Sequence, residues 1–257
     1  DMDGLKTLAE HHNIKLIEDC AQAHGALYKG RPVGGLGDVA AWSFCQDKIM
    51  TTGGEGGMVT CQDEDIWRRM WAFKDHGKSF EAVYERKHAP GFRWLHESVG
   101  TNWRMTEMQA VIGRIQLKRM PCWTLQRAKN AEDLAETLAP WSEQNGFINV
   151  PDFSTDAAQG SRHANYKFYA FVRPKKLPKG MTRDGVIAEF AAQGLPCMQG
   201  SCSEIYREKA FDGLGVRPRR RLPVARRLGE TSLMFVCPPG VQKVDIDLLK
   251  GGERAAA

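Results

Sequence analysis

Residues 1–20, DMDGLKTLAEHHNIKLIEDC, decide the fold class of this chain. Leu5, Leu8 and Ala9 recur at helical spacing behind acidic residues suited to a first helical turn, and the apolar run 14–17 follows closely. A helix followed directly by an apolar strand is the second half of a β-α-β unit, which predicts an α/β fold with a mostly parallel sheet. No strand precedes this helix, so we expect either that later strands build the sheet or that the chain lacks its beginning.

The following residues continue this alternation of strands and helices. Apolar runs over 39–44 and 57–61, bordered by glycine turns, predict two further buried strands. Asp63 is suited to cap a helix that reaches Lys74, and a strong helix is expected to begin after Thr106. The predicted core face of that second helix comprises Met108, Val111, Ile112 and Ile115. Residues 79–101 show no period and predict a long loop, of the kind that is functional or contacts a partner.

Pro121 is expected to end the helix before it, and the elements expected later in the chain are mostly shorter. A further helix is expected over 124–145. The shorter elements expected after it are a strand over 166–172, a helix over 182–193 ended by Gly194, and a strand over 232–237. We therefore predict the remainder of a large domain over residues 1–121 and a smaller α+β domain over residues 122–257.

Composition and charge restrict the class of protein. The 257 residues are 42% hydrophobic and 26% charged, which is typical of a soluble globular protein. A formal net charge of +5 gives little reason to expect nucleic acid as a partner. No apolar run approaches the roughly 18 residues of a membrane helix, and no leader sequence opens the chain. The seven cysteines are odd in number and lack zinc spacing, so we expect reduced thiols, a cytoplasmic protein and no membrane partner.

Three familiar catalytic motifs fail on inspection. Gly35, Gly37 and Ala40 match a dinucleotide fingerprint in spacing, but they precede a strand instead of a helix. The His-Glu pair at His96 lacks a second histidine at metalloprotease spacing. Ser43 lacks the G-x-S-x-G turn of a hydrolase. We therefore expect no nicotinamide site, no metal site and no nucleophilic serine.

One basic segment leaves two interpretations open. Residues 217–223, RPRRRLP, place Arg217, Arg219, Arg220 and Arg221 close together. The four arginines are suited to an anionic contact such as a phosphate, or they form a solvated loop next to two prolines.

Four polar residues near the predicted strand ends form a candidate cofactor-binding and catalytic set. Asp19 ends a predicted strand, Gln22 follows it, Ser43 ends the next strand, and Lys48 lies in a turn before the glycine-rich TTGGEGG. Strand ends at one edge of an α/β sheet converge on a common crevice. These side chains suit pyridoxal phosphate: the lysine for a Schiff base, the carboxylate for the pyridine nitrogen, the hydroxyl for the phosphate and the amide for the ring oxygen. Each also has a plainer explanation, since such an aspartate commonly forms a turn and such a lysine is commonly solvated.

Several blocks of the sequence resemble one known family. Residues 16–59, LIEDCAQAHGALYKGRPVGGLGDVAAWSFCQDKIMTTGGEGGMV, are similar to the cofactor segment of the DegT/DnrJ/EryC1/StrS sugar aminotransferases, which have the aspartate-aminotransferase-like fold, type I of the pyridoxal-phosphate-dependent transferases. The further matching blocks are HG at 76–77, GTNWRMTEMQAVIGRIQLKRM at 100–120, RHANYKFYAF at 162–171 and SCSEIYREKAF at 201–211. The resemblance implies a homodimer with pyridoxal 5'-phosphate, an amino donor that is usually glutamate, and a keto-sugar acceptor, generally nucleotide-linked.

The resemblance also implies roles for single residues. Lys48 would be the Schiff-base lysine and the proton shuttle between the cofactor and the sugar carbon. Asp19 would be the partner of the pyridinium nitrogen, Gln22 the contact to the ring oxygen, and Ser43 a phosphate ligand. Asn102, in the G-x-N-x-R-M block, is similar to the family asparagine that reaches the phosphate in the neighbouring subunit.

Two other positions have two interpretations each. Arg104 matches either a site residue or a structural arginine between subunits, and His163 matches either a site residue or a cap of the following strand. Lysine at position 48 favours transamination, because a related branch of sugar dehydratases has histidine there. The implied activity is amino transfer to a keto sugar in amino-sugar, polysaccharide or antibiotic-sugar biosynthesis.

The sequence departs from the family pattern in three places. Cys20 stands where an alanine is more usual, a swap of small residues. The last residues, about 20 in number, lack the usual histidine-proline ending. Family members also begin with a segment that supplies the first strands, a glycine-threonine phosphate turn and an aromatic ring, and this chain starts inside the large domain. A truncated, non-catalytic or regulatory relative that binds ligands with the same fold is therefore the alternative hypothesis.

Overall fold

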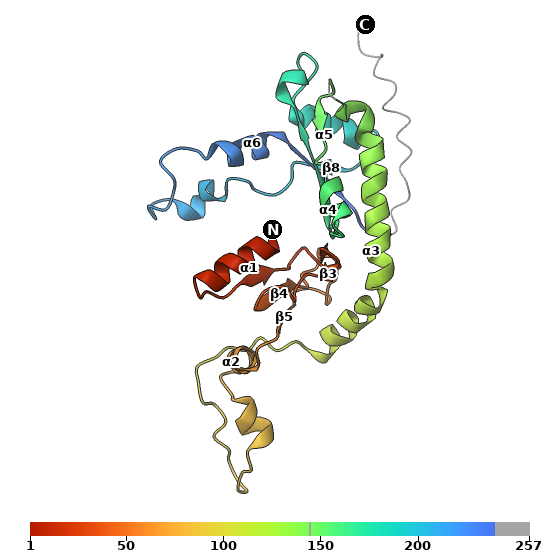
Figure 1. Cartoon of the computed structure of the whole chain (residues 1–257). Coiled ribbons are helices and arrows are strands. Elements are labelled where there is room, and N and C mark those ends of the chain that lie inside the picture. Colours follow the sequence, from red (N-terminus) through yellow and green to blue (C-terminus); the bar gives the residue numbers. More distant parts are fainter. Residues whose placement is uncertain (144, 240–257) are drawn as a thin grey trace. The chain divides into compact units, whose positions relative to one another are not determined.

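The computed structural model describes residues 1–143 and 145–239 of the chain (Figure 1). These residues form two compact units, of which the first comprises Asp1–Cys122 with Asp156–Ala164 and the second comprises Trp123–Thr155 with the chain from Asn165 onward. The domain limits 1–121 and 122–257 stay a prediction. Most of the divergent tail, from residue 240 to the end, lies outside the described residues.

The first unit contains a three-stranded sheet in the order β1-β4-β5. Its strands are β1 (Ile17–Asp19), β4 (Val39–Ser43) and β5 (Gly57–Cys61). β1 runs parallel to β4, whereas β5 is antiparallel to it, so the described sheet is mixed. Helix α1 (Met2–His11) precedes β1, which confirms the predicted order of helix and strand. The strand starts at Ile17 and not at Ile14, because the Ile14 N–H donates to the Ala9 carbonyl at the end of α1 (3.0 Å).

The strands of this sheet are less buried than the sequence predicts. Ile17, Met58 and Val59 are 67%, 53% and 49% exposed. Side chains project from the two faces of a strand, so these exposures show that the described residues leave those faces largely uncovered. The expectation of a buried strand is therefore wrong for β5 and for Ile17, whereas β4 is largely half-buried, with Ala40 1% and the following Phe44 4% exposed.

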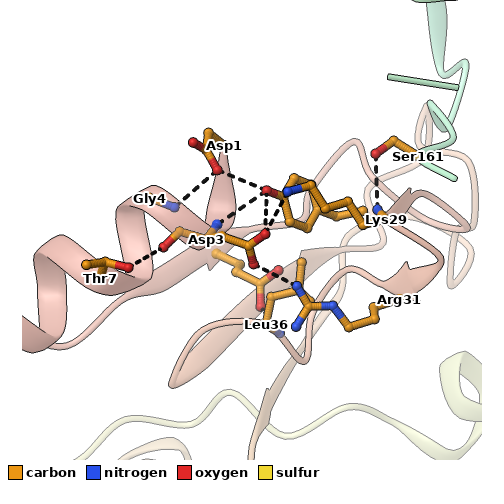
Figure 2. Close-up of polar contacts among 10 residues, drawn as sticks. Asp1, Asp3, Gly4, Thr7, Lys29, Arg31, Leu36 and Ser161 are labelled. Carbon is orange, nitrogen blue, oxygen red and sulfur yellow. Dashed lines mark hydrogen bonds and ion pairs between the residues drawn. The ribbon is translucent and has the colours of Figure 1, made fainter. Parts of the chain in front are cut away.

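A short hairpin is tied to α1 by charge. Its strands are β2 (Leu27–Tyr28) and β3 (Arg31–Pro32). Figure 2 shows the Asp3 carboxylate of α1 between Lys29 (2.8 Å to Nζ) and Arg31 (2.9 Å to Nη2). The hydrogen bond from Lys29, with those from Arg31 and Tyr28, lowers the pKa of Asp3 to about 2.

The same hairpin also contacts residues 156–164, which lie far away in sequence. Leu27 and Arg162 exchange two backbone hydrogen bonds of 2.9 Å each. The Lys29 N–H donates to the Ser161 hydroxyl at 3.1 Å, as Figure 2 shows. These contacts explain why the segment belongs to the first unit.

Glu18, in the middle of β1, organises the loop that leads into β4. Its side chain is buried, and its carboxylate accepts the backbone N–H groups of Gly34 (2.8 Å), Leu36 (2.7 Å) and Gly37 (2.7 Å). Three donors on one carboxylate fix the loop, because the Leu36 N–H is buried and the other two are half-buried, so all three gain from a charged acceptor. The neighbouring Asp19 points to the opposite face of the sheet, since side chains alternate along a strand.

We expect Glu18→Ala to lower the free energy of unfolding by about 2–4 kcal/mol, because it leaves the buried Leu36 N–H and the half-buried Gly34 and Gly37 N–H groups without their acceptor. Glu18→Gln keeps one acceptor oxygen and is expected to lower it less. Denaturant titration measures the loss, with the exposed Glu10→Ala on α1 as the control. Equal stability of the Glu18→Ala and Glu10→Ala proteins would contradict this role.

Two helices follow the sheet. Helix α2 (Glu64–Lys74) begins after Asp63, whose side chain accepts from the Ile66 N–H, which confirms the predicted cap. The predicted loop over 79–101 is irregular apart from a π-helical turn (Glu81–Glu85).

Helix α3 (Glu107–Ser142) is a single helix of 36 residues, so the expectation that Pro121 ends it is wrong. A proline removes one intrahelical hydrogen bond and bends a helix without ending it when the flanking turns are held. The predicted core face is also wrong as core, because Met108 is 77% exposed and Val111 54% exposed.

The second unit is an α+β arrangement around a four-stranded antiparallel sheet in the order β6-β7-β9-β8. Its strands are β6 (Ile148–Asn149), β7 (Lys167–Val172), β8 (Cys197–Met198) and β9 (Ser232–Val236). Its helices are α5 (Arg183–Ala192) and α6 (Pro223–Thr231), with 3-10 turns at Pro174–Lys176, Ile205–Arg207 and Lys209–Phe211. The short α4 (Ser154–Ala158) lies where the chain returns to the first unit.

The core of the second unit confirms the apolar periods of the sequence. It comprises Leu138, Ile148, Ala170, Val172, Val186, Phe190, Leu195, Cys197, Leu233 and Phe235. Thr182 caps α5 by accepting from the Gly185 N–H, and Gly194 follows the helix with a φ of 82°. Across residues 1–143 and 145–239, no helix combines the length and apolar character that crossing a membrane requires.

Candidate functional site

The structure brings the predicted carboxylate and hydroxyl to one edge and one face of the first sheet. Asp19 is the last residue of β1 and pairs with Ala41 of β4. Ser43 ends β4 two residues further on, so its side chain lies on the same face as that of Asp19. Gln22 follows β1 in the turn at this edge and is exposed. The carboxyl ends of two parallel strands therefore present an acid, an amide and a hydroxyl together.

Lys48 lies at the same edge, in the loop that joins β4 to β5. This loop, residues 44–56, closes through the Phe44 N–H, which donates to the Gly56 carbonyl at 2.8 Å. The Lys48 N–H donates to the Cys45 carbonyl at 3.0 Å and forms a turn. Ile49 and Met50, directly after the lysine, are 3% and 6% exposed. Two buried side chains thus anchor the backbone beside a half-buried lysine.

The carboxylate, amide, hydroxyl and amine groups of this site suit a molecule with a protonated ring nitrogen, a hydroxyl and a phosphate. One Asp19 oxygen accepts the Ala21 N–H at 3.0 Å, and the residue is exposed at the end of β1. The small, exposed Ala41 leaves the sheet face between Asp19 and Ser43 uncovered. This combination of donors, acceptors and open space fits pyridoxal phosphate.

Cys20, the departure beside Asp19, behaves as a small buried residue. It is 2% exposed, and burial, with the nearby charges of Glu18 and Asp19, raises the pKa of its thiol to about 11. The thiol stays protonated at neutral pH and packs like an apolar group.

Asn102 and Arg104 lie together at the base of the 79–101 loop. The Arg104 guanidinium donates to the Asn102 side-chain oxygen at 3.1 Å and lies 3.1 Å from His76 Nε2. Asn102 also pairs through its backbone with Asp75, a buried carboxylate 3.7 Å from Arg104 Nε. Within the chain, Arg104 therefore orients the asparagine and joins it to the His76-Gly77 block.

The glycine of that block is required by geometry. Gly77 has a φ of 82°, and a Cβ built on it would lie 1.7 Å from the Ser98 carbonyl oxygen. Its own carbonyl accepts the N–H groups of Glu97 (2.9 Å) and Ser98 (3.1 Å). The HG block therefore closes the base of the loop, where Asn102 lies.

His163 is exposed, in the segment that pairs with the β2-β3 hairpin. Its neighbour Arg162 donates from its side chain to the Gly25 carbonyl at 3.0 Å. Since Gly25 lies in the turn after Gln22, this segment supports the loop that leads from the site.

Two arginines of the segment 217–221 form hydrogen bonds or ion pairs within the second unit. Arg217 donates to the carbonyls of Tyr206 (2.8 Å), Arg207 (3.1 Å) and Glu208 (2.8 Å). Arg221 forms an ion pair with the buried Glu204. These two arginines hold a loop in place.

Glu204 predicts an acid-sensitive contribution to stability. Its carboxylate accepts from Arg221 and from the Tyr206 hydroxyl, and these contacts lower its pKa from 4.5 to about 2. A lowered pKa means that the stabilisation is complete above pH 4.5 and disappears as the pH falls towards 2. We expect Glu204→Gln to unfold at a lower temperature than the wild type at neutral pH, with the difference shrinking over that interval. Thermal unfolding across pH tests this, with the exposed Glu132→Gln as control; a pH-independent difference would contradict it.

Sequence reasoning missed two contributors to this site, Gln109 and Gln116 of α3. Each hydrogen bonds the backbone of the loop that contains Lys48. Their seven-residue spacing places them on one helix face, but the apolar residues between them suggested core.

Comparison with solved structures defines the class of protein. The aminotransferase from Psychrobacter cryohalolentis superposes with a TM-score of 0.91 at 58% sequence identity, over 98% of this chain and 65% of that one. The aspartate-aminotransferase-like fold expected from the sequence is thereby confirmed. A family model for the DegT/DnrJ/EryC1/StrS aminotransferase family matches residues 1–249, and the chain belongs to this family.

Two curated relatives share much of the sequence. GDP-perosamine synthase of Caulobacter vibrioides is 35% identical over 200 residues, which are 76% of this chain and 47% of the relative. UDP-N-acetyl-3-dehydro-alpha-D-glucosamine 3-aminotransferase of Acidithiobacillus ferrooxidans is 36% identical over 246 residues, 96% of this chain and 58% of the relative. The chain thus spans about half of the length of these relatives.

Proposed function

We propose that the whole protein is a pyridoxal-phosphate-dependent aminotransferase that moves an amino group to a nucleotide-linked keto sugar. The observation that supports this most directly is the gathering of Asp19, Gln22, Ser43 and the Lys48 loop at one edge of the sheet. A non-catalytic relative would have no need of a lysine anchored at that edge.

Each residue has a distinct task in this proposal. Bound pyridoxal phosphate supplies a conjugated ring that withdraws electrons from the carbon that bears the amino nitrogen. Lys48 would hold the cofactor covalently, and its Nζ would move the proton to and from the reacting carbon. The Asp19 carboxylate would accept the ring N–H and keep that nitrogen charged. Ser43 would donate its hydroxyl to the phosphate, and Gln22 would donate its amide to the ring oxygen.

The names of the curated relatives indicate the substrate class that we propose for this protein. Both curated relatives carry names of enzymes that make amino derivatives of nucleotide sugars. We propose the same substrate class here, with glutamate as the amino donor and amino-sugar or polysaccharide biosynthesis as the setting. The seven cysteines are all free, which supports a cytoplasmic location.

We further propose a homodimer in which Asn102 serves the neighbouring subunit's site. The support is its exposed position, oriented by Arg104 and held at the base of a loop with large exposed side chains. Phe92 and Trp94 in this loop are 81% and 83% exposed, which is unusual for aromatic residues of a lone subunit.

The experiment is a spectroscopic titration of the full-length protein. We expect pyridoxal phosphate to bind with a visible absorbance band that glutamate bleaches and that a nucleotide-linked keto sugar then restores. A panel of such sugars, assayed for amino-sugar product by mass spectrometry, identifies the acceptor. Binding without bleaching by any amino donor would refute transamination and favour the ligand-binding alternative.

A further inference from the structure

We propose that Gln109 and Gln116 are positioning residues that set the conformation of the Lys48 loop, residues 44–56. This inference rests on the proposed function for its catalytic consequence, although the contacts themselves are independent of it. The Gln116 side-chain oxygen accepts the Thr51 N–H at 2.8 Å. The Gln109 side-chain nitrogen donates to the Glu55 carbonyl at 2.8 Å.

The two glutamines hold the loop on both sides of its glycine pair, Gly53-Gly54. Thr51 precedes and Glu55 follows the pair Gly53-Gly54, whose φ angles are 83° and 153°. Glycines lose the most conformational freedom on ordering, so a glycine-rich turn needs external partners to keep one conformation. A hydrogen bond at each end of the turn supplies them.

The helix face between the glutamines is shaped to receive the loop. Thr52, which is 1% exposed, faces Gly113 of α3, where a built Cβ would lie 3.1 Å from the threonine methyl group. A Cβ built on Gly53 would lie 2.9 Å from the Ile112 side chain. Because glycines on both surfaces permit this close approach, the loop and α3 form one packed contact.

The anchor at Thr51 is transmitted to Lys48 through a short, buried stretch. The two residues between them, Ile49 and Met50, are buried. The Thr51 hydroxyl donates to the Phe44 carbonyl at 3.1 Å, and the Thr52 N–H donates to the same carbonyl at 3.2 Å. A shift of Thr51 therefore displaces the backbone that leads to Lys48.

The two amides act in opposite ways, and this difference makes the proposal testable. Gln116 uses its oxygen as an acceptor, which a glutamate can replace. Gln109 must donate from its nitrogen, because its oxygen already accepts from the N–H and the hydroxyl of Thr106 (3.0 Å each). A glutamate at position 109 keeps the contact with Thr106 but places a carboxylate oxygen against the Glu55 carbonyl.

The test compares Gln116→Ala, Gln116→Glu, Gln109→Ala and Gln109→Glu in the full-length holoenzyme, with Gln62→Ala as the control. Gln62 is exposed after β5, outside the loop and its contacts. Hydrogen–deuterium exchange of residues 44–56 is measured beside kcat, KM and the visible absorbance of bound pyridoxal phosphate. Exchange reports the loop itself, whether or not the protein is active.

We expect each alanine variant to exchange the loop amides about tenfold faster and to lose about tenfold in kcat, with KM nearly unchanged. Gln116→Glu is expected to restore both values, and Gln109→Glu is not. Unchanged exchange in both alanine variants would overturn the proposal, as would identical behaviour of the two glutamate variants. If the wild type fails to bind pyridoxal phosphate, the proposed function fails, while the exchange results still decide the role of the glutamines.

Discussion

Lys48→Ala is expected to abolish the visible absorbance of the pyridoxal phosphate complex and to lower kcat by roughly a thousandfold or more. The covalent link and the proton transfer both require the Lys48 Nζ in our proposal, and alanine has no amine. The cofactor is still expected to bind weakly through Asp19, Gln22 and Ser43. Absorbance spectra and steady-state kinetics of the full-length protein measure both effects.

The control for this substitution is Lys179→Ala, which removes an exposed lysine of the second unit. It is expected to leave the spectrum and kcat unchanged. Retention of both by the Lys48→Ala protein would show that another residue holds the cofactor.

Asp19→Asn is expected to lower kcat by roughly a hundredfold or more, because the ring nitrogen loses the carboxylate that keeps it charged. The asparagine keeps an oxygen that can accept the Ala21 N–H, which Asp19 binds at 3.0 Å. The substitution therefore tests the charge and spares the turn. Kinetics and the pH dependence of the cofactor absorbance are the measurements.

Two further variants complete that test. Asp65→Asn, which changes an exposed acid in the first turn of α2, is expected to have no effect on kcat. Asp19→Ala is expected to lose both the charge and the turn contact and to be less stable than Asp19→Asn. Normal activity of the Asp19→Asn protein would mean that Asp19 is a turn residue only.

Much of the fold could be predicted because hydrophobic periods report local structure. The strands at 39–44 and 57–61, the Asp63 cap and the helix over 182–193 could be predicted, since alternation and capping depend on neighbours in sequence. Pro121 misled the prediction, because a proline removes one hydrogen bond while the rest of α3 stays intact. The exposure of Ile17 depends on which elements pack on its face of the sheet, and no local pattern contains that information.

Some residues of the candidate site could also be predicted from the sequence, and others could not. Asp19, Ser43 and Lys48 could be placed at one edge because parallel strands end there. Glu18 was overlooked although it adjoins Asp19, since its three partners are backbone groups 16 to 19 residues away. The contacts of Arg217 could not be predicted either. Its partners are backbone carbonyl oxygens, which every residue has, and the sequence does not show which carbonyl groups lie near the arginine.

The first unit is built from two separate stretches of the chain, and this has a consequence for folding during synthesis on the ribosome. Residues 156–164 complete this unit through Leu27 and Arg162, but they are translated after more than thirty residues of the second unit. The hairpin at 27–32 therefore lacks its partner until the later segment emerges, and the first unit cannot finish folding before residues 156–164 are made. A nascent chain stalled after Cys122 would remain incomplete, and the two units are expected to mature together.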